Sequence, residues 1–464
     1  MRSMSRFLIA AVVFVASGPL PTGAVAHDLA VTAQAATDAQ PAHAAQGTVL
    51  FRNVRIFDGT SGTVSAPRDV LVRGNRIERI AAALAPEPGA RMIDGAGRVL
   101  MPGLIDVHWH SMMAAASIPA LLNGDQRYLS LVAGAEAGRT LMRGFTTVRD
   151  LGGNVFGLKQ AVDEGVLPGP RIFPSGAMIT VTSGHGDFRR PGDLPRKLGT
   201  PGPTDLEGDT AIADSPDEVR LRVREQLMRG ASQIKLTAGG GVSSPHSPLD
   251  VITFTGPELR AAVEAAANWG TYVTVHAYTS EAIRRAIDAG VKVIEHGSLM
   301  DEDTARLMAR QGIWLSIQPF AHEMAEAFAP GSFERAKAEE VFEGNERAYA
   351  LAKKHHLKTA FGTDVLFSAA LAARQGAILA SLARWYTPAE VLVMATGANG
   401  ELLKLSGKRS PYPGELGVVR EGALADLLLV DGDPTVDLTL VARPEQSFRI
   451  IMKDGVIYKD TLAR

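Results

Sequence analysis

The chain has 464 residues, of which 46% are hydrophobic, and its 48 Lys and Arg nearly balance its 50 Asp and Glu, for a formal net charge of -2. This length exceeds one small domain but suits a single large barrel with an accessory domain, and the composition is that of a soluble globular enzyme. The balanced charge gives no basic surplus for capturing a polyanion, so we expect no nucleic-acid partner.

Residues 1–26 have the pattern of a secretory signal peptide. Arg2 and Arg6 precede the apolar run FLIAAVVFVA, and GAVAHD offers a small-residue cleavage site that ends at Ala26. The apolar run is too short to span a bilayer, and the alternative of a buried N-terminal helix does not account for the charged start. We therefore expect a secreted or periplasmic protein with no membrane span after cleavage. The absence of Cys agrees with export but decides little.

The two ends of the mature chain share a β-rich texture. Residues 27–46, rich in Ala, Gln, Thr and His, predict a disordered linker. Residues 47–100 read as short strands separated by Gly, Asn and Pro, and residues 406–464 read likewise, with a KDG turn between two strands. We expect both ends to build one composite β-domain beside a second domain formed by residues 101–405.

The middle region alternates short β-rich runs with Ala-rich helical stretches. Segments such as GPELRAAVEAAANWG and SEAIRRAIDAG each end at a glycine, a common helix C-terminal cap. Eight such units predict an α/β fold, a (β/α)8 TIM barrel whose chemistry lies at the C-terminal ends of the strands; a doubly wound sheet is the alternative. The eight predicted strands are GLIDVHWH, TTVRD, RIFPSG, QIKLTA, YVTVHA, KVIEHG, WLSIQP and TAFGTD.

Ionisable residues gather at the ends of these strands. In DVHWH, positions two apart on a strand project from the same face, so His108 and His110 would point at one spot. An isolated pair of this kind is more often a core histidine beside a surface histidine. Other strands change that balance, because they add further candidates in the same kind of position. These are Lys235 on strand four, His276 on strand five, His296 on strand six and Asp364 on strand eight.

This set of side chains suits a metal centre. Neutral imidazole is the commonest zinc ligand, and histidines from different strands leave one coordination position open for water. Asp364 could bind a metal through one oxygen and take the proton of that water through the other. Lys235 fits as a carbamate formed with carbon dioxide, an anion able to bridge two ions. Its alternatives are a salt bridge to Asp364 or a buried structural amine. His355 and His356, on the polar stretch KKHH, are expected to be solvated.

The order HxH, Lys, His, His and Asp resembles the amidohydrolase superfamily in its binuclear form with a carboxylated lysine. The flanking segments NVRIFDGT, MPGLIDVHWH, VIEHG, FGTD and EGALADLLLVDGDP agree with that resemblance. It implies a TIM barrel with a small β-sandwich built from both chain ends, and two divalent ions, with zinc expected first and manganese or cobalt as alternatives. By this resemblance His108 and His110 bind the more buried ion, His276 and His296 the more exposed one, Lys235 bridges them as N6-carboxylysine, and Asp364 binds metal and shuttles the proton.

Within the superfamily, FTTVRDLGG, PSGAMITVTSGHGD and FGTDVLF resemble the prolidase-like and imidazolonepropionase-like branch. That branch includes metallodipeptidases, metallocarboxypeptidases and bacterial amidohydrolases that cleave ochratoxin A. It implies hydrolysis, by hydroxide that bridges the two ions, of an amide next to a free carboxylate in a dipeptide or an N-acyl amino acid. Homo-oligomers are frequent among such relatives. The alternatives are a cyclic-amide hydrolase, which export disfavours, and a periplasmic metal-binding protein without activity.

Four further residues are predicted to face the substrate. His185, in TSGHGD after strand three, would by the resemblance polarise the scissile carbonyl; alternatively it stabilises its loop. Tyr278 would donate a hydrogen bond in the pocket or lie at its rim, and His246 belongs to the loop GGGVSSPHSP. Arg189 would clamp a substrate carboxylate in a bidentate pair or be a solvated loop charge. The Gly- and Pro-rich insertion at 187–210 is of the kind that becomes a lid or an interface.

Overall fold

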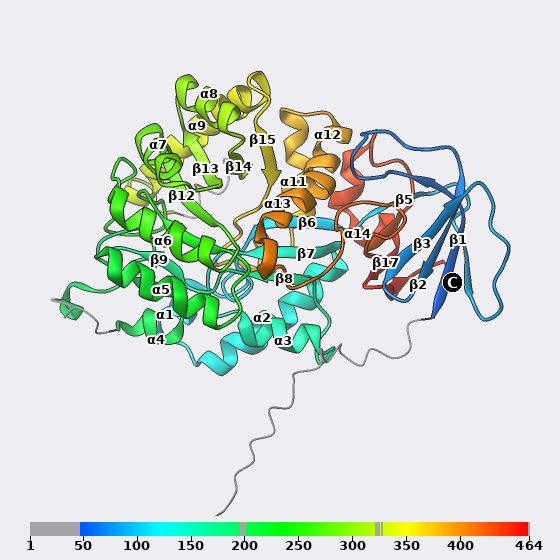
Figure 1. Cartoon of the computed structure of the whole chain (residues 1–464), viewed down its shortest axis with the longest axis horizontal. Coiled ribbons are helices and arrows are strands. Elements are labelled where there is room, and N and C mark those ends of the chain that lie inside the picture. The colour runs from blue at the N-terminus through cyan, green and yellow to red at the C-terminus, as the bar shows by residue number, and fades with distance from the viewer. Residues whose placement is uncertain (1–46, 195–200, 321–324, 326–327, 463–464) are drawn as a thin grey trace, which may run out of the picture. The chain divides into compact units, whose positions relative to one another are not determined.

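The computed structural model describes residues 47–462 apart from 195–200, 321–324, 326 and 327 (Figure 1). The predicted signal peptide at 1–26 and the predicted linker at 27–46 lie outside the described residues. Among the helices of the described part of the chain, none is both long enough and apolar enough to cross a bilayer.

Each of the eight predicted barrel strands is present, and neighbouring strands pair in parallel. The third strand is interrupted, because β8 pairs with the strand before it and its continuation β9 pairs with the strand after it. The barrel closes where the Asp364 N–H, after the last strand, donates to the His108 carbonyl at 2.8 Å. This closure excludes the doubly wound alternative. The strands are β6 (Leu104–Trp109), β7 (Phe145–Asp150), β8 (Arg171–Pro174), β9 (Met178–Thr180), β11 (Ile234–Thr237), β12 (Val273–Thr279), β13 (Val293–Leu299), β14 (Trp314–Ile317) and β15 (Lys358–Phe361).

Helices connect consecutive barrel strands, as parallel pairing requires. In α7 (Ser280–Ala289) the Thr279 side chain accepts from the Ala282 N–H at the start, and Gly290 ends the helix at a φ of 100°. Both ends are therefore set by local sequence. The other connecting helices are α2 (Gln126–Met142), α3 (Phe156–Asp163), α5 (Pro216–Met228), α6 (Gly256–Asn268), α8 (Glu302–Gln311) and α9 (Phe333–Lys354), and α10 (Ala369–Ala372), α11 (Gln375–Ala380), α12 (Pro388–Val393) and α13 (Asn399–Leu403) follow β15.

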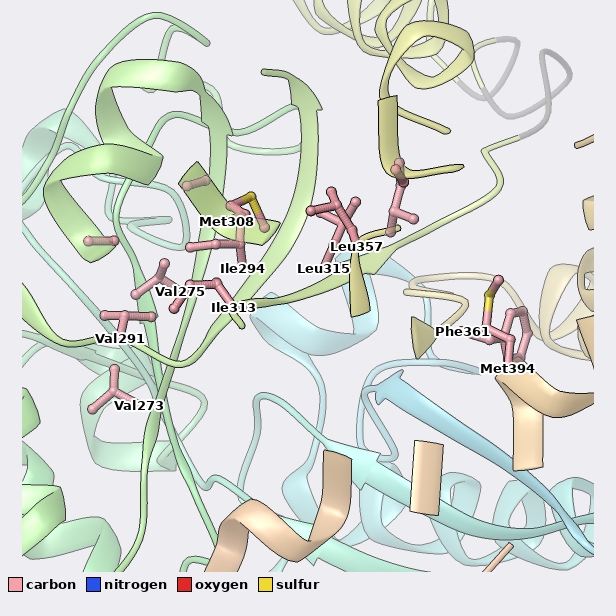
Figure 2. Close-up of a cluster of buried hydrophobic side chains, with 14 of the residues drawn as sticks. Val273, Val275, Val291, Ile294, Met308, Ile313, Leu315, Leu357, Phe361 and Met394 are labelled. Atoms are coloured by element: carbon pink, nitrogen blue, oxygen red, sulfur yellow. The ribbon is translucent and has the colours of Figure 1, made fainter. Parts of the chain in front are cut away.

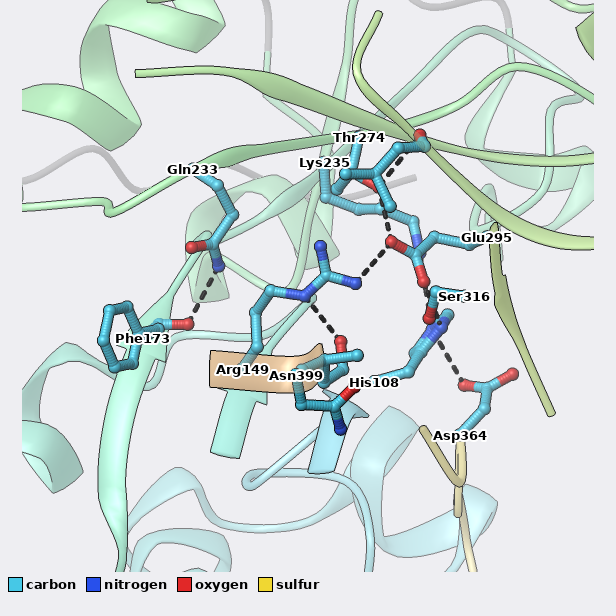
Figure 3. Close-up of polar contacts among 12 residues, drawn as sticks. His108, Arg149, Phe173, Gln233, Lys235, Thr274, Glu295, Ser316, Asp364 and Asn399 are labelled. Carbon is cyan, nitrogen blue, oxygen red and sulfur yellow. Dashed lines mark hydrogen bonds and ion pairs between the residues drawn. The ribbon is translucent and has the colours of Figure 1, made fainter. Parts of the chain in front are cut away.

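Alternation along the barrel strands separates an apolar layer from a polar interior. Val275, Ile294 and Leu315 are completely buried in the cluster that lies between the strands and the helices (Figure 2). The intervening residues of the same strands include Thr274 and Glu295, whose side chains hydrogen bond to each other inside the barrel (Figure 3). Because side chains in a strand alternate between faces, the polar set is directed toward the barrel axis.

The accessory domain is a sheet that both chain ends build together, as predicted, in the order β18-β17-β16-β5-β1-β2-β3, with β4 also paired to β1. A register shift between Phe51 and Val54 divides β1 between two parts of the sheet, and Asn53 adopts a φ of 52° there. Phe51, Leu429 and Ile450 from both ends are fully buried in one core. The strands are β1 (Thr48–Ile56), β2 (Arg68–Arg73), β3 (Arg76–Ala81), β4 (Arg91–Asp94), β5 (Val99–Pro102), β16 (Leu427–Val430), β17 (Phe448–Lys453) and β18 (Val456–Asp460).

A buried ion cluster joins the barrel to the accessory domain. Arg171 of β8 donates to Asp426 at 2.9 Å and to Asp454 at 2.6 Å. Arg171 and Asp426 are almost completely buried, so this contact fixes the start of β8 against the start of β16 and the turn after β17.

Candidate functional site

The six predicted metal-site residues line one cavity of about 680 Å³ at the C-terminal ends of the barrel strands. His108 and His110 come from the end of β6, Lys235 from β11, His276 from β12, His296 from β13, and Asp364 follows β15. Sequence positions as far apart as 108 and 364 thus meet because the barrel closes. This location agrees with the rule that TIM-barrel sites form at the C-terminal face.

His108, His110 and Asp364 form the tightest group. The Asp364 Oδ1 atom lies 3.3 Å from His108 Nε2 and 3.2 Å from His110 Nε2, and the three ligand atoms all lie within 4.8 Å of one another. Ligand atoms around a tetrahedral zinc ion with bonds of about 2.0–2.1 Å are separated by about 3.3 Å. The spacing of these three atoms therefore fits a divalent cation.

The second nitrogen of each of these two rings faces a group that can accept its proton. His108 Nδ1 lies 2.9 Å from Glu295 Oε2, and His110 Nδ1 lies 3.3 Å from the Gly152 carbonyl oxygen. We assign the proton to Nδ1 in both rings, which leaves each Nε2 lone pair directed at Asp364. In His108, the Gln318 Nε2 amide also lies 3.1 Å from Nδ1, but Glu295 Oε2 is buried with no other hydrogen-bond partner in the described part of the chain, and a carboxylate is the stronger acceptor for a ring N–H.

Burial sets the charge state of this centre. Burial, and then the nearby Lys235, lower the pKa of His108 well below its usual value, so the ring is neutral and able to act as a ligand. Burial opposes ionisation of Asp364, but the adjacent histidines outweigh it and hold the Asp364 pKa below its usual value. A neutral imidazole and an ionised carboxylate are the forms that bind metals.

His276 and His296 lie directly beside this group. The His296 ring centroid is 5.1 Å from that of His108 and 4.4 Å from that of His276. His276 Nε2 lies 2.7 Å from the Gly240 carbonyl oxygen. A proton on Nε2 donates to that oxygen and leaves the lone pair of Nδ1 for a metal. His296 Nδ1 is buried and has no hydrogen-bond partner in the described part of the chain, so this nitrogen is one that could bind a metal ion.

Two residues of the site have an unusual backbone. His296 has a φ of 74° and Asp364 a φ of 50°, a conformation that is uncommon outside glycine. In β13 the conformation also accounts for a break in alternation, since both Glu295 and His296 lie against His108. Such strain is retained where the surrounding structure requires it, and functional sites are the usual place.

Lys235 lies at the floor of the cavity, with Nζ 3.4 Å from His108 Nε2 (Figure 3). The amine forms no ion pair with any carboxylate of the described residues, Asp364 included, so the alternative of a Lys235–Asp364 salt bridge is wrong. Burial lowers the pKa of Lys235 to about 8. A buried amine that has no carboxylate of the described residues in ion-pair contact and lies against the His108 imidazole leaves the predicted carbamate and a structural amine as its two interpretations.

The four predicted substrate contacts divide into two pairs. His185 and Tyr278 line the cavity, and their rings lie 4.3 Å and 4.7 Å from the His276 ring. His185 Nδ1 is 2.9 Å from the Ser244 hydroxyl, which orients the ring. His246, in contrast, is exposed and is not among the described residues that line the cavity.

Arg189 is neither a carboxylate clamp on the cavity wall nor a solvated charge. Its guanidinium donates to both oxygens of Asp187, at 2.8 and 2.7 Å, and it is buried. Because the partner is only two residues away, the loop itself neutralises the charge of the arginine, and the predicted clamp at this position is corrected.

The match to known families agrees with the site. Residues 99–459 match the model of the amidohydrolase family. The chain belongs to this family. An ochratoxinase of Aspergillus niger is 31% identical over an alignment of 391 residues, and the match covers 78% of this chain and 76% of that protein. A prolidase crystallised with N-methylphosphonate-L-proline is 32% identical, with a TM-score of 0.82 over 89% of this chain and 100% of that one. A Xaa-Pro dipeptidase with bound methionine in its active site is 29% identical, with a TM-score of 0.76 over 89% of this chain and 100% of that one.

The structure of this amidohydrolase adds residues that the sequence did not reveal. Glu295 and Arg149 form a completely buried ion pair of 2.6 Å behind His108. Glu295 stands next to His296 in VIEHG, and this charge inside an apolar strand was the available signal. Arg374 lines the cavity, but its segment AALAARQG has no distinctive pattern.

Proposed function

We propose that this amidohydrolase is metal-dependent and cleaves an amide bond next to a free carboxylate, in a dipeptide or an N-acyl amino acid, with an ochratoxin-like amide as one candidate. The observation that carries the proposal is the convergence of His108 Nε2, His110 Nε2 and Asp364 Oδ1 at metal-ligand spacing inside a large cavity. The relatives support it, since ochratoxinase, prolidase and Xaa-Pro dipeptidase are among the names of similar proteins.

We further propose two divalent cations, zinc first among them. His108, His110 and Asp364 would hold one, and His276 and His296 would contribute to the other. Lys235, as N6-carboxylysine, would supply oxygen atoms to both, because an ammonium has no lone pair for a metal. The unpartnered His296 Nδ1 and the absence of an ion pair on Lys235 within the described residues support this arrangement.

The side chains of the site supply the remaining chemistry. Bound cations would lower the pKa of a water and polarise the substrate carbonyl. The ionised Asp364 carboxylate would accept a proton from that water and return it to the departing amine nitrogen. His185, oriented by Ser244, would donate a hydrogen bond to the developing oxyanion. Tyr278 lines the same cavity and would donate its hydroxyl hydrogen bond to the substrate.

A hydrolysis panel tests this proposal. N-acyl amino acids and dipeptides with C-terminal residues from Pro and Phe to Lys and Arg are assayed with and without chelator, alongside metal analysis. We expect cleavage of at least one linear substrate, its loss with chelator, and its recovery with zinc. Stoichiometric zinc without hydrolysis of any amide would instead favour a metal-binding protein, and cleavage of cyclic amides alone would favour the lactam-type alternative.

Export and self-association are proposals of the same kind. We propose that residues 1–26 are removed on export to the periplasm or exterior, and that the mature protein forms a homo-oligomer. N-terminal sequencing of protein from a periplasmic fraction tests the first, and light scattering of the purified protein tests the second. A mature protein that starts at Met1, or a monomer at micromolar concentration, would contradict them respectively.

A further inference from the structure

The walls of the cavity above the metal site are largely apolar. Aromatic side chains from several separate loops and helices contribute, and the volume of about 680 Å³ is in the range that encloses a ligand larger than a small dipeptide. The acidic side chains among the described lining residues are Asp209 and Asp364, and the latter belongs to the metal site. The phenylalanines of the wall are Phe188, Phe320, Phe328, Phe342 and Phe367.

One arginine stands on this apolar wall. Apart from the histidines, Lys235 and Arg374 are the cationic side chains among the described residues that line the cavity, and Lys235 lies at the floor against His108. The Arg374 side chain is exposed to solvent. Nothing in the described ranges forms an ion pair or side-chain hydrogen bond with it, whereas Arg189 is already paired with Asp187.

The backbone at Arg374 is held in place relative to the metal site. The next residue, Gln375, is completely buried, and its amide donates to Asp106 Oδ2 at 2.9 Å and accepts from Arg143 at 3.2 Å. Asp106 lies on β6, two residues before His108. Upstream, before α10, the Phe367 N–H donates to the Met113 carbonyl at 3.0 Å. Arg374 is thus presented from an anchored segment rather than from a free loop.

We propose that Arg374 binds the carboxylate of a substrate whose remaining parts are large and apolar, such as an aromatic acyl group on an aromatic amino acid. This inference rests on the proposed amide hydrolase and names its substrate class. A guanidinium without an ion pair among the described residues presents parallel N–H groups that match a carboxylate, and apolar walls favour aromatic groups through burial of their surface. The scarcity of acidic lining residues disfavours substrates with a C-terminal Lys or Arg.

The test compares N-benzoyl-L-phenylalanine with N-benzoyl-L-phenylalaninamide, which lacks the carboxylate. In Arg374→Gln we expect KM for the acid to rise by about tenfold or more with little change in kcat, and kinetics for the amide to stay the same. Arg374→Lys should recover part of the difference, since charge is kept but the paired N–H geometry is lost. Arg310→Gln, an exposed arginine of α8 outside the cavity lining, is the control. A damaged fold would lower activity toward both compounds, so unchanged kinetics with the amide show that Arg374→Gln has lost only the recognition of the carboxylate.

The outcomes separate this inference from the proposed function. If the wild type hydrolyses the acid and Arg374→Gln leaves its preference over the amide unchanged, Arg374 is not the carboxylate site. If the wild type hydrolyses neither compound, calorimetric titration with N-benzoyl-L-phenylalanine still tests Arg374, because binding needs no turnover. Weaker binding in Arg374→Gln supports the inference, and equal binding overturns it. N-acetylglycine, with the same carboxylate but no bulk, should be a poorer substrate or ligand than the benzoyl compound.

Discussion

Replacing Glu295 by Gln tests how the protein orients its first histidine. Glu295 Oε1 accepts from Arg149 at 2.6 Å, while Oε2 lies 2.9 Å from His108 Nδ1. A glutamine that keeps its oxygen on Arg149 turns its NH2 group toward His108 Nδ1 and forces the ring proton onto Nε2. The reversed glutamine places its NH2 group against the guanidinium. The first arrangement removes the Nε2 lone pair that would bind a metal, and in the second a buried donor faces another donor.

The expected magnitudes follow from the two roles of the carboxylate. Loss of a partner that orients a metal-binding histidine lowers metal affinity by about 10- to 100-fold, or about 1.4–2.7 kcal/mol. Breaking a buried ion pair costs about 3–5 kcal/mol of unfolding free energy. Because the glutamine oxygen still accepts one hydrogen bond from Arg149, we expect a value near the lower end, about 3 kcal/mol.

Glu136→Gln is the matched control. Glu136 is also buried and accepts from Arg143 at 2.6 Å and from Arg139 at 2.7 Å, but no hydrogen bond or ion pair joins it to a histidine of the described residues. Zinc affinity is measured by competition with a chromogenic chelator, and unfolding of the metal-free proteins by urea denaturation. Both variants should be less stable, and only Glu295→Gln should bind zinc more weakly. Equal zinc affinity in the two variants would refute the assignment of Glu295 as the group that orients His108.

Four further predictions follow from the structure. Asp364→Asn should lower kcat by at least about a thousandfold, because one carboxylate both binds metal and carries the proton; activity within tenfold of wild type would exclude that role. Gly241→Ala places a Cβ 2.0 Å from His185 Nδ1 and should lower kcat by about a hundredfold, whereas Gly239→Ala, with its nearest contact at 3.6 Å, should not. Arg171→Met should cost about 3–5 kcal/mol of unfolding free energy at neutral pH by calorimetry. Burial opposes ionisation of Asp454, but Arg171 outweighs this effect and lowers the Asp454 pKa below 3.8. The stabilisation by the Arg171–Asp454 ion pair is therefore present above that pH and is lost as the pH falls through the lowered pKa. Over that range the difference in unfolding free energy between Arg171→Met and wild type should narrow. Dialysis against a chelator should abolish hydrolysis and lower the melting temperature, and zinc should restore both.

Local sequence was sufficient to place the barrel strands and the residues at their ends. Short β-rich runs predicted β6 and β12, and the glycine that closes SEAIRRAIDAG, Gly290, predicted where α7 ends. Both signals are carried by residues within a few positions of one another, so they can be read from the sequence without knowledge of the fold. The interruption of the third strand between β8 and β9 carried no such signal.

Contacts between distant segments required the tertiary structure. Arg149 and Glu295 are 146 positions apart, and Arg143 and Gln375 are 232 apart, so neither pairing can be read from spacing. In the sequence Arg189 appeared available to a substrate, yet in the structure Asp187 pairs with it. The segment around Arg374 had no distinctive pattern, yet the anchoring of Gln375 on Asp106 presents Arg374 to the cavity. The sequence by itself determined which side chains stand at the strand ends. Only closure of the barrel decided which of them face one another and which charges are left for a ligand, because a charge is free or paired according to neighbours that the chain brings together over long distances.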